Sequence, residues 1–317
     1  MRVRVLHHHH CFDGAAAAAF FTRFVEEKFY PGAEFAYTGM VHEPNQKFAD
    51  SLFDGDVNAI VDFKYAANPK LTWWFDHHES AFLSQEDMDY FTQAAAPWHF
   101  LDPKFRSCTK YIDYIARERF GFTAPDLAEL VQWADIIDGA QYANAQEAVE
   151  IHEPPTQLVL VIESAKAQGI VEKIIRMMQS QSLAAIAADP DVRGLFEPLY
   201  QQHLSTIDTI RRLSHSERGV VFFDLVDSRL EGYNKFIPYY LHPESIYTVS
   251  ILENGTRTKI SVGSNPWVDG EIQHNLARIC ERYGGGGHPR VGAISLPKGA
   301  TDEARRVATE IVRELQS

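Results

Sequence analysis

Three short apolar segments in the first 80 residues each meet ionisable side chains near their ends. Residues 3–6 run into a row of four histidines, residues 57–63 include Asp62, and residues 71–75 run into Asp76. Short, continuous apolar runs are typical of strands buried on both faces. Because helical patterns separate strands here, a mainly parallel sheet is expected, and such sheets bind ligands beyond the carboxyl ends of their strands. The pattern predicts an α/β domain with its site at one edge of the sheet.

The remaining elements are predicted along the whole chain. Further strands are expected at 34–41 and 219–226, and a hairpin joins 246–252 to 256–262 around the turn signal Asn254-Gly255. Helices are expected at 15–28, 110–120, 126–139, about 270–283 and 301–315, and throughout 157–215 with a break at Asp189-Pro190. The predicted domains are an α/β catalytic domain at 1–156, a helical connector at 157–215 and a smaller α/β substrate-binding domain at 216–317.

Composition excludes several classes of protein. A net charge of −13 over 317 residues argues against a general DNA-coating protein, which needs broad basic surfaces. No apolar run approaches the roughly 20 residues that span a membrane, and residues 1–6 lack the apolar core of a signal peptide. Three widely separated cysteines favour a reduced, cytoplasmic protein without disulfides.

Potential metal ligands gather in four segments. These are His-His-His-His-Cys-Phe-Asp-Gly at 7–14, the strand end with Asp62, Asp-His-His-Glu at 76–79, and Ala-Asp-Ile-Ile-Asp at 134–138. Mixed imidazole and carboxylate ligands suit Mn²⁺, Fe²⁺, Zn²⁺ or Co²⁺ better than Ca²⁺. Five or more such ligands exceed the needs of one catalytic zinc ion, and a carboxylate such as Asp62 can bridge two ions about 3.5–4 Å apart. Alternatively, the histidines are a purification tag, Asp62 is a turn residue, and Asp135 and Asp138 lie on a solvated helix face.

Two of these motifs together resemble a known family. Asp76-His77-His78, combined with four glycines and His288 at 284–288, resembles the DHH phosphoesterase family, subfamily 1, with its C-terminal DHH-associated domain. The resemblance covers nearly the whole chain except the helical connector. It implies a two-metal site, commonly Mn²⁺, in the N-terminal domain and a substrate-holding C-terminal domain. Members of the family hydrolyse phosphodiester or phosphoanhydride bonds in short RNA, single-stranded DNA, cyclic dinucleotides, nucleotide bisphosphates and polyphosphate.

The resemblance assigns roles by position. His78 corresponds to the family's phosphate-contacting histidine, and Asp76 is expected to orient the site through hydrogen bonds. Asp138 is the alternative to Asp135 as the last ligand. The implied metal ligands are His7, Cys11, Asp13, Asp62, His77 and Asp135.

Cys11 is a departure from the family pattern, because it stands where the family has an aspartate. A thiolate can bind a metal, and this softer ligand would shift the preference towards Zn²⁺ or Fe²⁺. Alternatively, Cys11 lies outside the ligand shell and His9 or His10 compensates.

Two further segments are predicted to hold the substrate. Arg106-Ser107 precedes a helix and can hold a phosphate, although Ser107 as an ordinary N-cap is an equal alternative. Gly286 and Gly287 permit close backbone approach to a phosphate before His288 and Arg290, although the glycines can also form only a flexible turn. Trp267 is a further aromatic side chain, for which packing is favoured over stacking on a base.

These observations predict a metal-dependent phosphoesterase with two divalent ions. Mn²⁺ is expected first, and Zn²⁺, Fe²⁺, Co²⁺ or Mg²⁺ also fit. The expected substrate is a short single-stranded oligonucleotide or a small nucleotide. Nucleic-acid binding and exonuclease activity are therefore also expected. A homodimer and a cytoplasmic location, without membrane partners, are also expected. One alternative is an exopolyphosphatase or pyrophosphatase, and another is a nucleotide sensor without catalysis.

Overall fold

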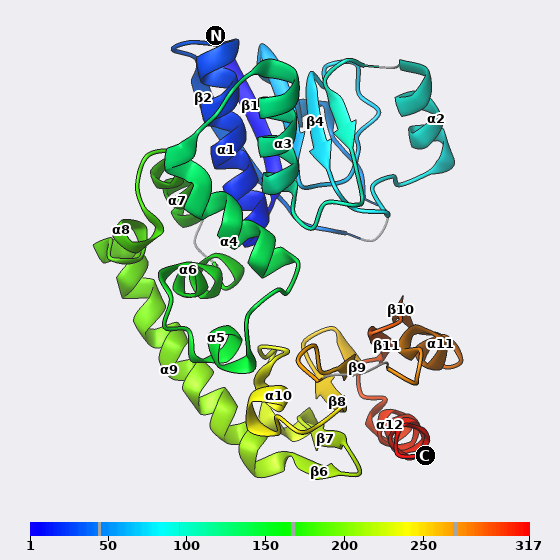
Figure 1. The fold of residues 1–317 in the computed structure, drawn as a ribbon. Coiled ribbons are helices and arrows are strands. Elements are labelled where there is room, and N and C mark those ends of the chain that lie inside the picture. Colours follow the sequence, from blue (N-terminus) through cyan, green and yellow to red (C-terminus); the bar gives the residue numbers. More distant parts are fainter. Residues whose placement is uncertain (44–45, 95, 166–168, 269–271) are drawn as a thin grey trace. The chain divides into compact units, whose positions relative to one another are not determined.

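Two separate sheets organise the chain in this computed structural model, which describes residues 1–43, 46–94, 96–165, 169–268 and 272–317 (Figure 1). Unit 1 comprises residues 1–142 and 152–199, and unit 2 comprises residues 143–151 and 200–317. The boundary at 199–200 falls inside helix α9 (Pro190–Leu213). The functional division into domains at 156 and 216 stays a prediction. Within the described part of the chain, no helix is both long and apolar enough to cross a membrane.

The sheet of unit 1 is entirely parallel, in the order β2-β1-β3-β4-β5. Its strands are β1 (Arg2–His8), β2 (Glu34–Met40), β3 (Val57–Val61), β4 (Trp73–Asp76) and β5 (His99–Leu101). The helices are α1 (Phe12–Lys28), α2 (Gln85–Ala94), α3 (Cys108–Phe120), α4 (Ala128–Asp138), α6 (Pro154–Glu163), α7 (Ile170–Met178) and α8 (Leu183–Ala187), with 3₁₀ turns η1 (Asp50–Leu52) and η2 (Pro125–Leu127). The predicted parallel α/β sheet is thus confirmed.

Apolar residues cover both faces of this sheet. In β4, Trp73 and Phe75 join the core beneath α1, whereas Trp74 joins a second cluster on the opposite face. β3 divides in the same way, with Val61 on one face and Ile60 on the other. Successive side chains of a strand point to opposite faces, so these continuous apolar runs mark strands buried on both sides. Figure 1 shows α1 and α3 beside the strands.

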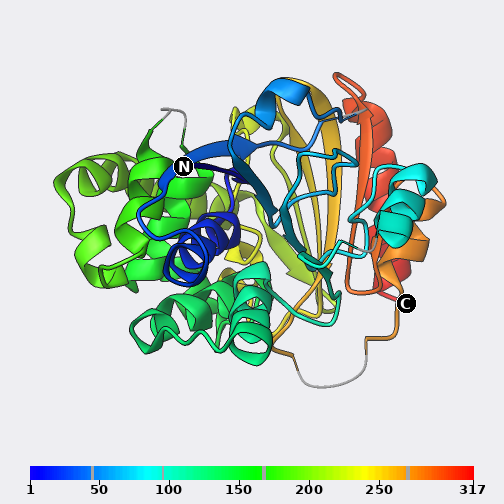
Figure 2. The ribbon, with the colours of Figure 1, turned by 90° about the horizontal axis from the view of Figure 1, so that it is seen from above.

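Unit 2 is built on a mixed sheet in the order β10-β11-β9-β8-β7-β6. Its strands are β6 (His215–Glu217), β7 (Val220–Asp224), β8 (Tyr247–Glu253), β9 (Arg257–Ser264), β10 (Gly286–His288) and β11 (Val291–Pro297). Its other elements are α5 (Ala145–Glu150), η3 (Val226–Ser228), α10 (Ile237–Leu241), α11 (Leu276–Glu281) and α12 (Thr301–Leu315). β8 and β9 form the predicted hairpin, and α12 packs against them with its predicted bounds (Figure 2).

Two helical predictions differ from the structure. In its described residues, the stretch at 157–215 is not one helix with a single break but contains parts of four helices, because Gly169, with a φ of 103°, and the N-cap Ser182 begin new helices. Residues 166–168 of that prediction lie outside the described residues. The helix expected at 270–283 is only α11, because Asn275 caps its N-terminus by accepting from the Arg278 N–H. Part of that prediction, at 270–271, lies outside the described residues.

Candidate metal centre

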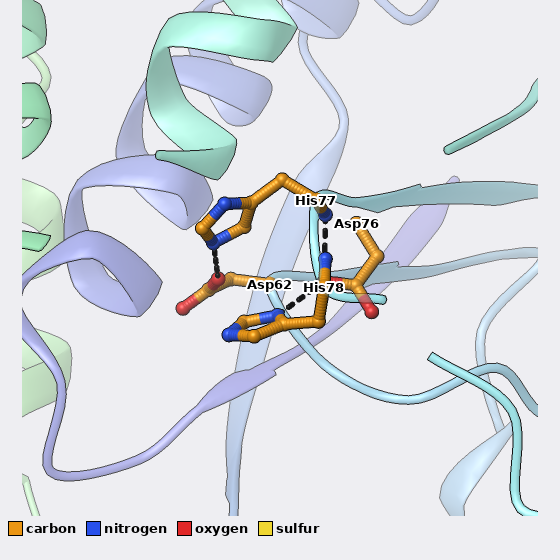
Figure 3. A group of neighbouring side chains, drawn as sticks. All are labelled: Asp62, Asp76, His77 and His78. Atoms are coloured by element: carbon orange, nitrogen blue, oxygen red, sulfur yellow. Dashed lines mark hydrogen bonds and ion pairs between the residues drawn. The ribbon is translucent and has the colours of Figure 1, made fainter. Parts of the chain in front are cut away.

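The ionisable residues meet at the carboxyl ends of β1, β3 and β4. Parallel pairing of β3 with both neighbours brings these strand ends to one edge of the sheet. Among the described residues, three groups of potential ligands lie there with their donor atoms within 4.8 Å of one another. The groups are Asp62, Asp76, His77 and His78; His8, Cys11 and Asp62; and Asp13, His77 and Asp138. Figure 3 shows the first group.

Asp62 belongs to two of these three groups. It is only 1% exposed and has a φ of 56°, a left-handed conformation that is uncommon outside glycine and gathers at functional sites. Its Oδ1 lies 3.3 Å from His77 Nε2, and its Oδ2 lies 3.4 Å from His8 Nδ1 (Figure 3 for His77). Neither oxygen receives a hydrogen bond of normal geometry. A buried carboxylate in this state is costly unless it binds a cation.

His77 is oriented by the main chain. Its Nδ1 lies 3.1 Å from the Phe105 carbonyl oxygen, which can only accept, so Nδ1 carries the proton. The other nitrogen, Nε2, lies 3.3 Å from Asp62, 3.3 Å from Asp138 and 3.9 Å from Asp13. Metal-binding histidines usually donate their second ring N–H to such a carbonyl. The geometry therefore leaves Nε2 as the nitrogen that can take an ion.

Asp13 is held by the N-terminus of α3. Its Oδ2 accepts from the Cys108 N–H at 2.6 Å, and its Oδ1 accepts from the N–H and hydroxyl of Thr109 at 3.0 and 2.5 Å. The glycine that follows it is required by packing, because a Cβ at Gly14 would lie 2.2 Å from the His8 carbonyl oxygen. The start of α1 can thus approach β1 closely enough to bring Asp13 to the site.

Asp76 fixes the geometry of the motif that follows β4. Its Oδ1 accepts from the backbone N–H groups of His77 and His78, at 2.8 and 3.3 Å, and lies 2.7 Å from His78 Nδ1 (Figure 3). This contact leaves His78 Nε2 for another partner, and the His78 side chain is 40% exposed. The arrangement is what the predicted orienting role of Asp76 requires.

The carboxylates of this site create a strongly negative field, which shifts the pKa values of its members. Burial and the neighbouring carboxylates raise the pKa of Asp13 well above its usual range and that of Asp138 to about 6. Burial alone would lower the pKa of His77 and raise that of Asp62, but their mutual attraction and the other charged neighbours outweigh it. The pKa of His77 is therefore raised to about 10, and that of Asp62 is lowered. Positive charge is favoured at this point, which is what a cation site needs.

The thiol of Cys11 lies in the second ligand group. Cys11 is the N-cap of α1, with extended backbone at φ −133° and ψ 131°. Burial, followed by the charges of Asp62 and Asp13, raises the pKa of this thiol. Among the described residues, neither His9 nor His10 belongs to any ligand group, so the structure brings the thiol, and not these histidines, to Asp62.

For two predicted ligands, His7 and Asp135, the structure brings a nearby residue of the same type to the site instead. His7 is buried, and its Nδ1 lies 3.1 Å from the His8 carbonyl oxygen, whereas His8 is the histidine beside Asp62. Likewise Asp138, the alternative to Asp135, is the α4 carboxylate beside His77. Sequence reasoning missed His8. The sequence does not distinguish it from His7, because the choice depends on the strand register of the structure, which pairs residue 6 with residue 60 and so, two residues on, directs His8 to Asp62.

The predicted substrate residues lie at the start of α3 and at β10. Ser107 is the N-cap of α3 and accepts from the Lys110 N–H at 3.2 Å, while Arg106 is exposed. In unit 2, Gly286, Gly287 and His288 form the short edge strand β10, and Arg290 is exposed in the turn to β11. These roles stay predictions.

The packing of Trp267 agrees with the favoured interpretation, because its ring lies against Phe236 and Tyr239, with centroids 5.4 and 6.5 Å away.

The donor set fits divalent metal ions. Asp62 Oδ1 and Oδ2, His77 Nε2 and His8 Nδ1 are all buried without a hydrogen-bond partner and converge on the same edge of the sheet. Unpaired buried polar atoms are rare in proteins, and here they carry the lone pairs that ions bind. One carboxylate facing two donor groups is the arrangement expected for a pair of ions.

Comparisons with known proteins show the fold. No protein-family model matches the sequence, and none of the curated proteins matches it. A solved structure of PggH, a pGpG-specific phosphodiesterase from Vibrio cholerae, is similar over 98% of this chain and 99% of its own, with 17% identity and a TM-score of 0.70. A DHH domain, described as part of a member of a family of ribosomal proteins, is similar over 100% of this chain and 87% of its own, with 14% identity and a TM-score of 0.58.

RecJ from Thermus thermophilus, in complex with Mn²⁺, is similar over 98% of this chain and 52% of its own, with 14% identity and a TM-score of 0.54. A second structure of that protein contains Mg²⁺. The chain therefore has the fold of these solved structures, one of which is a DHH domain, as the sequence resemblance implied.

Proposed function

We propose that this chain is a metal-dependent phosphoesterase that hydrolyses phosphodiester bonds of short single-stranded oligonucleotides or small nucleotides. The observation that carries the proposal is Asp62, a buried carboxylate whose two oxygens face two separate groups of ligand atoms. The similarity over the full length of a pGpG-specific phosphodiesterase supports a linear dinucleotide as the first substrate to test.

The site residues of unit 1 have different proposed roles. Two divalent ions, with Mn²⁺ expected first, would supply a nucleophile from water near neutral pH and neutralise the phosphoryl charge. One part of the donor set consists of Asp13, Asp62, His77 and Asp138. The N-terminus of α3 keeps Asp13 in place. His78, fixed through Nδ1 by Asp76, offers Nε2 to a phosphoryl oxygen or to the leaving group. Removing the Asp76 carboxylate would leave that imidazole without its orienting partner.

A substrate panel with a ligand variant tests the proposal. The protein is freed of metal by chelation, loaded with Mn²⁺, and assayed on pGpG, longer oligonucleotides, cyclic dinucleotides, nucleotide bisphosphates and polyphosphate. We expect turnover of a linear dinucleotide or short oligonucleotide, loss of most turnover and of bound metal in Asp62→Asn, and unchanged values in Asp302→Asn, an exposed control. Turnover of polyphosphate alone would contradict the substrate class, and no turnover with full metal content would contradict the activity.

Three finer points belong to the same proposal. We infer that two ions bind, that the protein forms a homodimer, and that it works in the cytoplasm. Metal analysis, sedimentation at several protein concentrations and cell fractionation measure these points separately.

A further inference from the structure

Asp62 divides the metal centre into two parts of different chemistry. Its Oδ1 faces His77, which is shared with the carboxylates of Asp13 and Asp138, and its Oδ2 faces His8, which is grouped with Cys11. We call the first part the carboxylate subsite (Asp13, Asp62, His77, Asp138) and the second the thiol subsite (His8, Cys11, Asp62).

The two subsites favour different ions. Carboxylate oxygens suit Mg²⁺ and Mn²⁺, whereas thiolate and imidazole ligands select softer ions such as Zn²⁺, Co²⁺ and Fe²⁺. Oxygen atoms dominate the carboxylate subsite, while the thiol subsite combines one sulfur, one nitrogen and one carboxylate. We propose that the two subsites bind different metal ions, an inference that rests on the function proposed above. Cys11 is a metal ligand, and its sulfur makes the thiol subsite bind a thiophilic divalent ion.

The cysteine is not the sole basis for this subsite. Asp62 is 1% exposed, and its Oδ2 has no hydrogen-bond partner although it points towards His8. His8 Nδ1 is a second buried atom without a hydrogen-bond partner. Cys11 is brought to them because the chain turns sharply between β1 and α1, where His10 takes a φ of 56°. A buried nitrogen and a buried oxygen, neither with a hydrogen-bond partner, therefore lie within 4.8 Å of the sulfur.

Cobalt spectroscopy tests this assignment without any substrate. The protein is stripped of metal and titrated with Co²⁺, whose bond to a thiolate gives a charge-transfer band in the near ultraviolet that oxygen and nitrogen ligands do not give. We expect this band in the native protein and in Cys280→Ser, a control for a buried cysteine of unit 2. We expect it to be absent in Cys11→Ser, with about one Co²⁺ still bound by the carboxylate subsite.

A competition experiment measures the selectivity. Loss of a partner that only supports a ligand already changes metal affinity about 10–100-fold, so exchange of the ligand itself should do at least as much. In Cys11→Asp, we expect the preference for Zn²⁺ over Mn²⁺ to fall at least about tenfold, measured by elemental analysis after equilibration with both ions. Far-ultraviolet circular dichroism establishes that each variant is folded.

The outcomes separate this inference from the proposed function. A thiolate band that persists in Cys11→Ser, or no band in native protein that holds two Co²⁺ ions, would overturn the role of Cys11 even if phosphodiesters are hydrolysed. A band that depends on Cys11 in a protein that hydrolyses none of the panel would uphold the ligand assignment while the proposed activity fails. An unchanged Zn²⁺ preference in Cys11→Asp would overturn the selectivity.

Discussion

At the scale of single residues, two carboxylates of α4 compete for one role. Asp138 Oδ2 lies 3.3 Å from His77 Nε2, and the Asp138 side chain is 27% exposed, whereas Asp135 belongs to none of the ligand groups among the described residues. The two positions are three apart on the helix, so the sequence spacing alone puts both on neighbouring positions of one face. Only the distance to the imidazole distinguishes them.

We therefore expect Asp138→Asn, and not Asp135→Asn, to weaken metal binding. The amide keeps the size of the side chain but removes the negative charge that faces His77, so Mn²⁺ affinity should fall at least about tenfold. Isothermal titration of the two metal-free variants measures this, and each variant serves as the other's control. A loss confined to Asp135→Asn would restore Asp135 as the ligand.

His288 is expected to bind substrate without affecting the metal. It is exposed on β10 in unit 2, whereas every group of ligand atoms identified among the described residues belongs to unit 1. Losing one hydrogen bond to a phosphate should cost roughly 1.5–3 kcal/mol, so His288→Ala should lower kcat/KM about tenfold to a hundredfold at unchanged metal content. His215→Ala, at the opposite edge of the same sheet, is the matched control. Equal kinetics of both variants and native protein would remove His288 from substrate binding.

At the scale of elements, Gly286 and Gly287 lie in the edge strand β10, and Gly285 directly precedes it. A Cβ at Gly285 would lie 2.2 Å from the Ala293 carbonyl oxygen, and a Cβ at Gly287, where φ is 149°, would lie 2.2 Å from that of Val291. At Gly286 a Cβ would meet nothing within 4 Å. Gly285 and Gly287 thus permit the chain to approach β11 closely, whereas a side chain at Gly286 would lie in open space.

Substitution of neighbouring glycines should separate folding from binding. We expect Gly287→Ala to destabilise unit 2 by about 1–3 kcal/mol, because the backbone conformation at Gly287 disfavours a side chain and a Cβ there would clash with its neighbours. Gly286→Ala should change stability by no more than about 0.5 kcal/mol but should raise KM if a phosphate approaches that backbone. Chemical denaturation and steady-state kinetics measure the two effects. Equal loss of stability in both variants would contradict the assignment.

The elements show why the sequence predicts some features and not others. The strands before Asp62 and Asp76 were predictable, since continuous apolar runs such as Trp73-Trp74-Phe75 reflect burial on two faces. The choice between His7 and His8 was not, because it depends on the pairing register of β1 with β3, and shifting one residue reverses the face. Helix α2 and strand β5, which have no strong pattern of their own, were also missed.

At the scale of the whole molecule, the chain has a separate apolar core in each unit. The core beneath α1 contains residues of unit 1 only, and the core around β8, β9 and α12 contains residues of unit 2 only. Four of the five tryptophans, Trp73, Trp74, Trp98 and Trp133, belong to unit 1, and Trp267 belongs to unit 2. Because the candidate metal centre also lies in unit 1, tryptophan fluorescence reports mainly on the unit that contains this centre.

This separation makes the effect of metal on stability measurable in one unit. A ligand that binds only the folded state stabilises it by about 2.7 kcal/mol at a hundred times its Kd, which corresponds to roughly 5–10 °C for a unit of this size. In Trp267→Phe, whose remaining tryptophans all lie in unit 1, saturating Mn²⁺ should therefore raise the Tm of the fluorescence transition by that amount, and chelation should reverse the rise. The same background carrying Asp62→Asn should show little or no rise, because its two ligand groups lose their shared charge. If Mn²⁺ raised the Tm equally in both proteins, the stabilising ion would be bound somewhere other than at the ends of β1, β3 and β4.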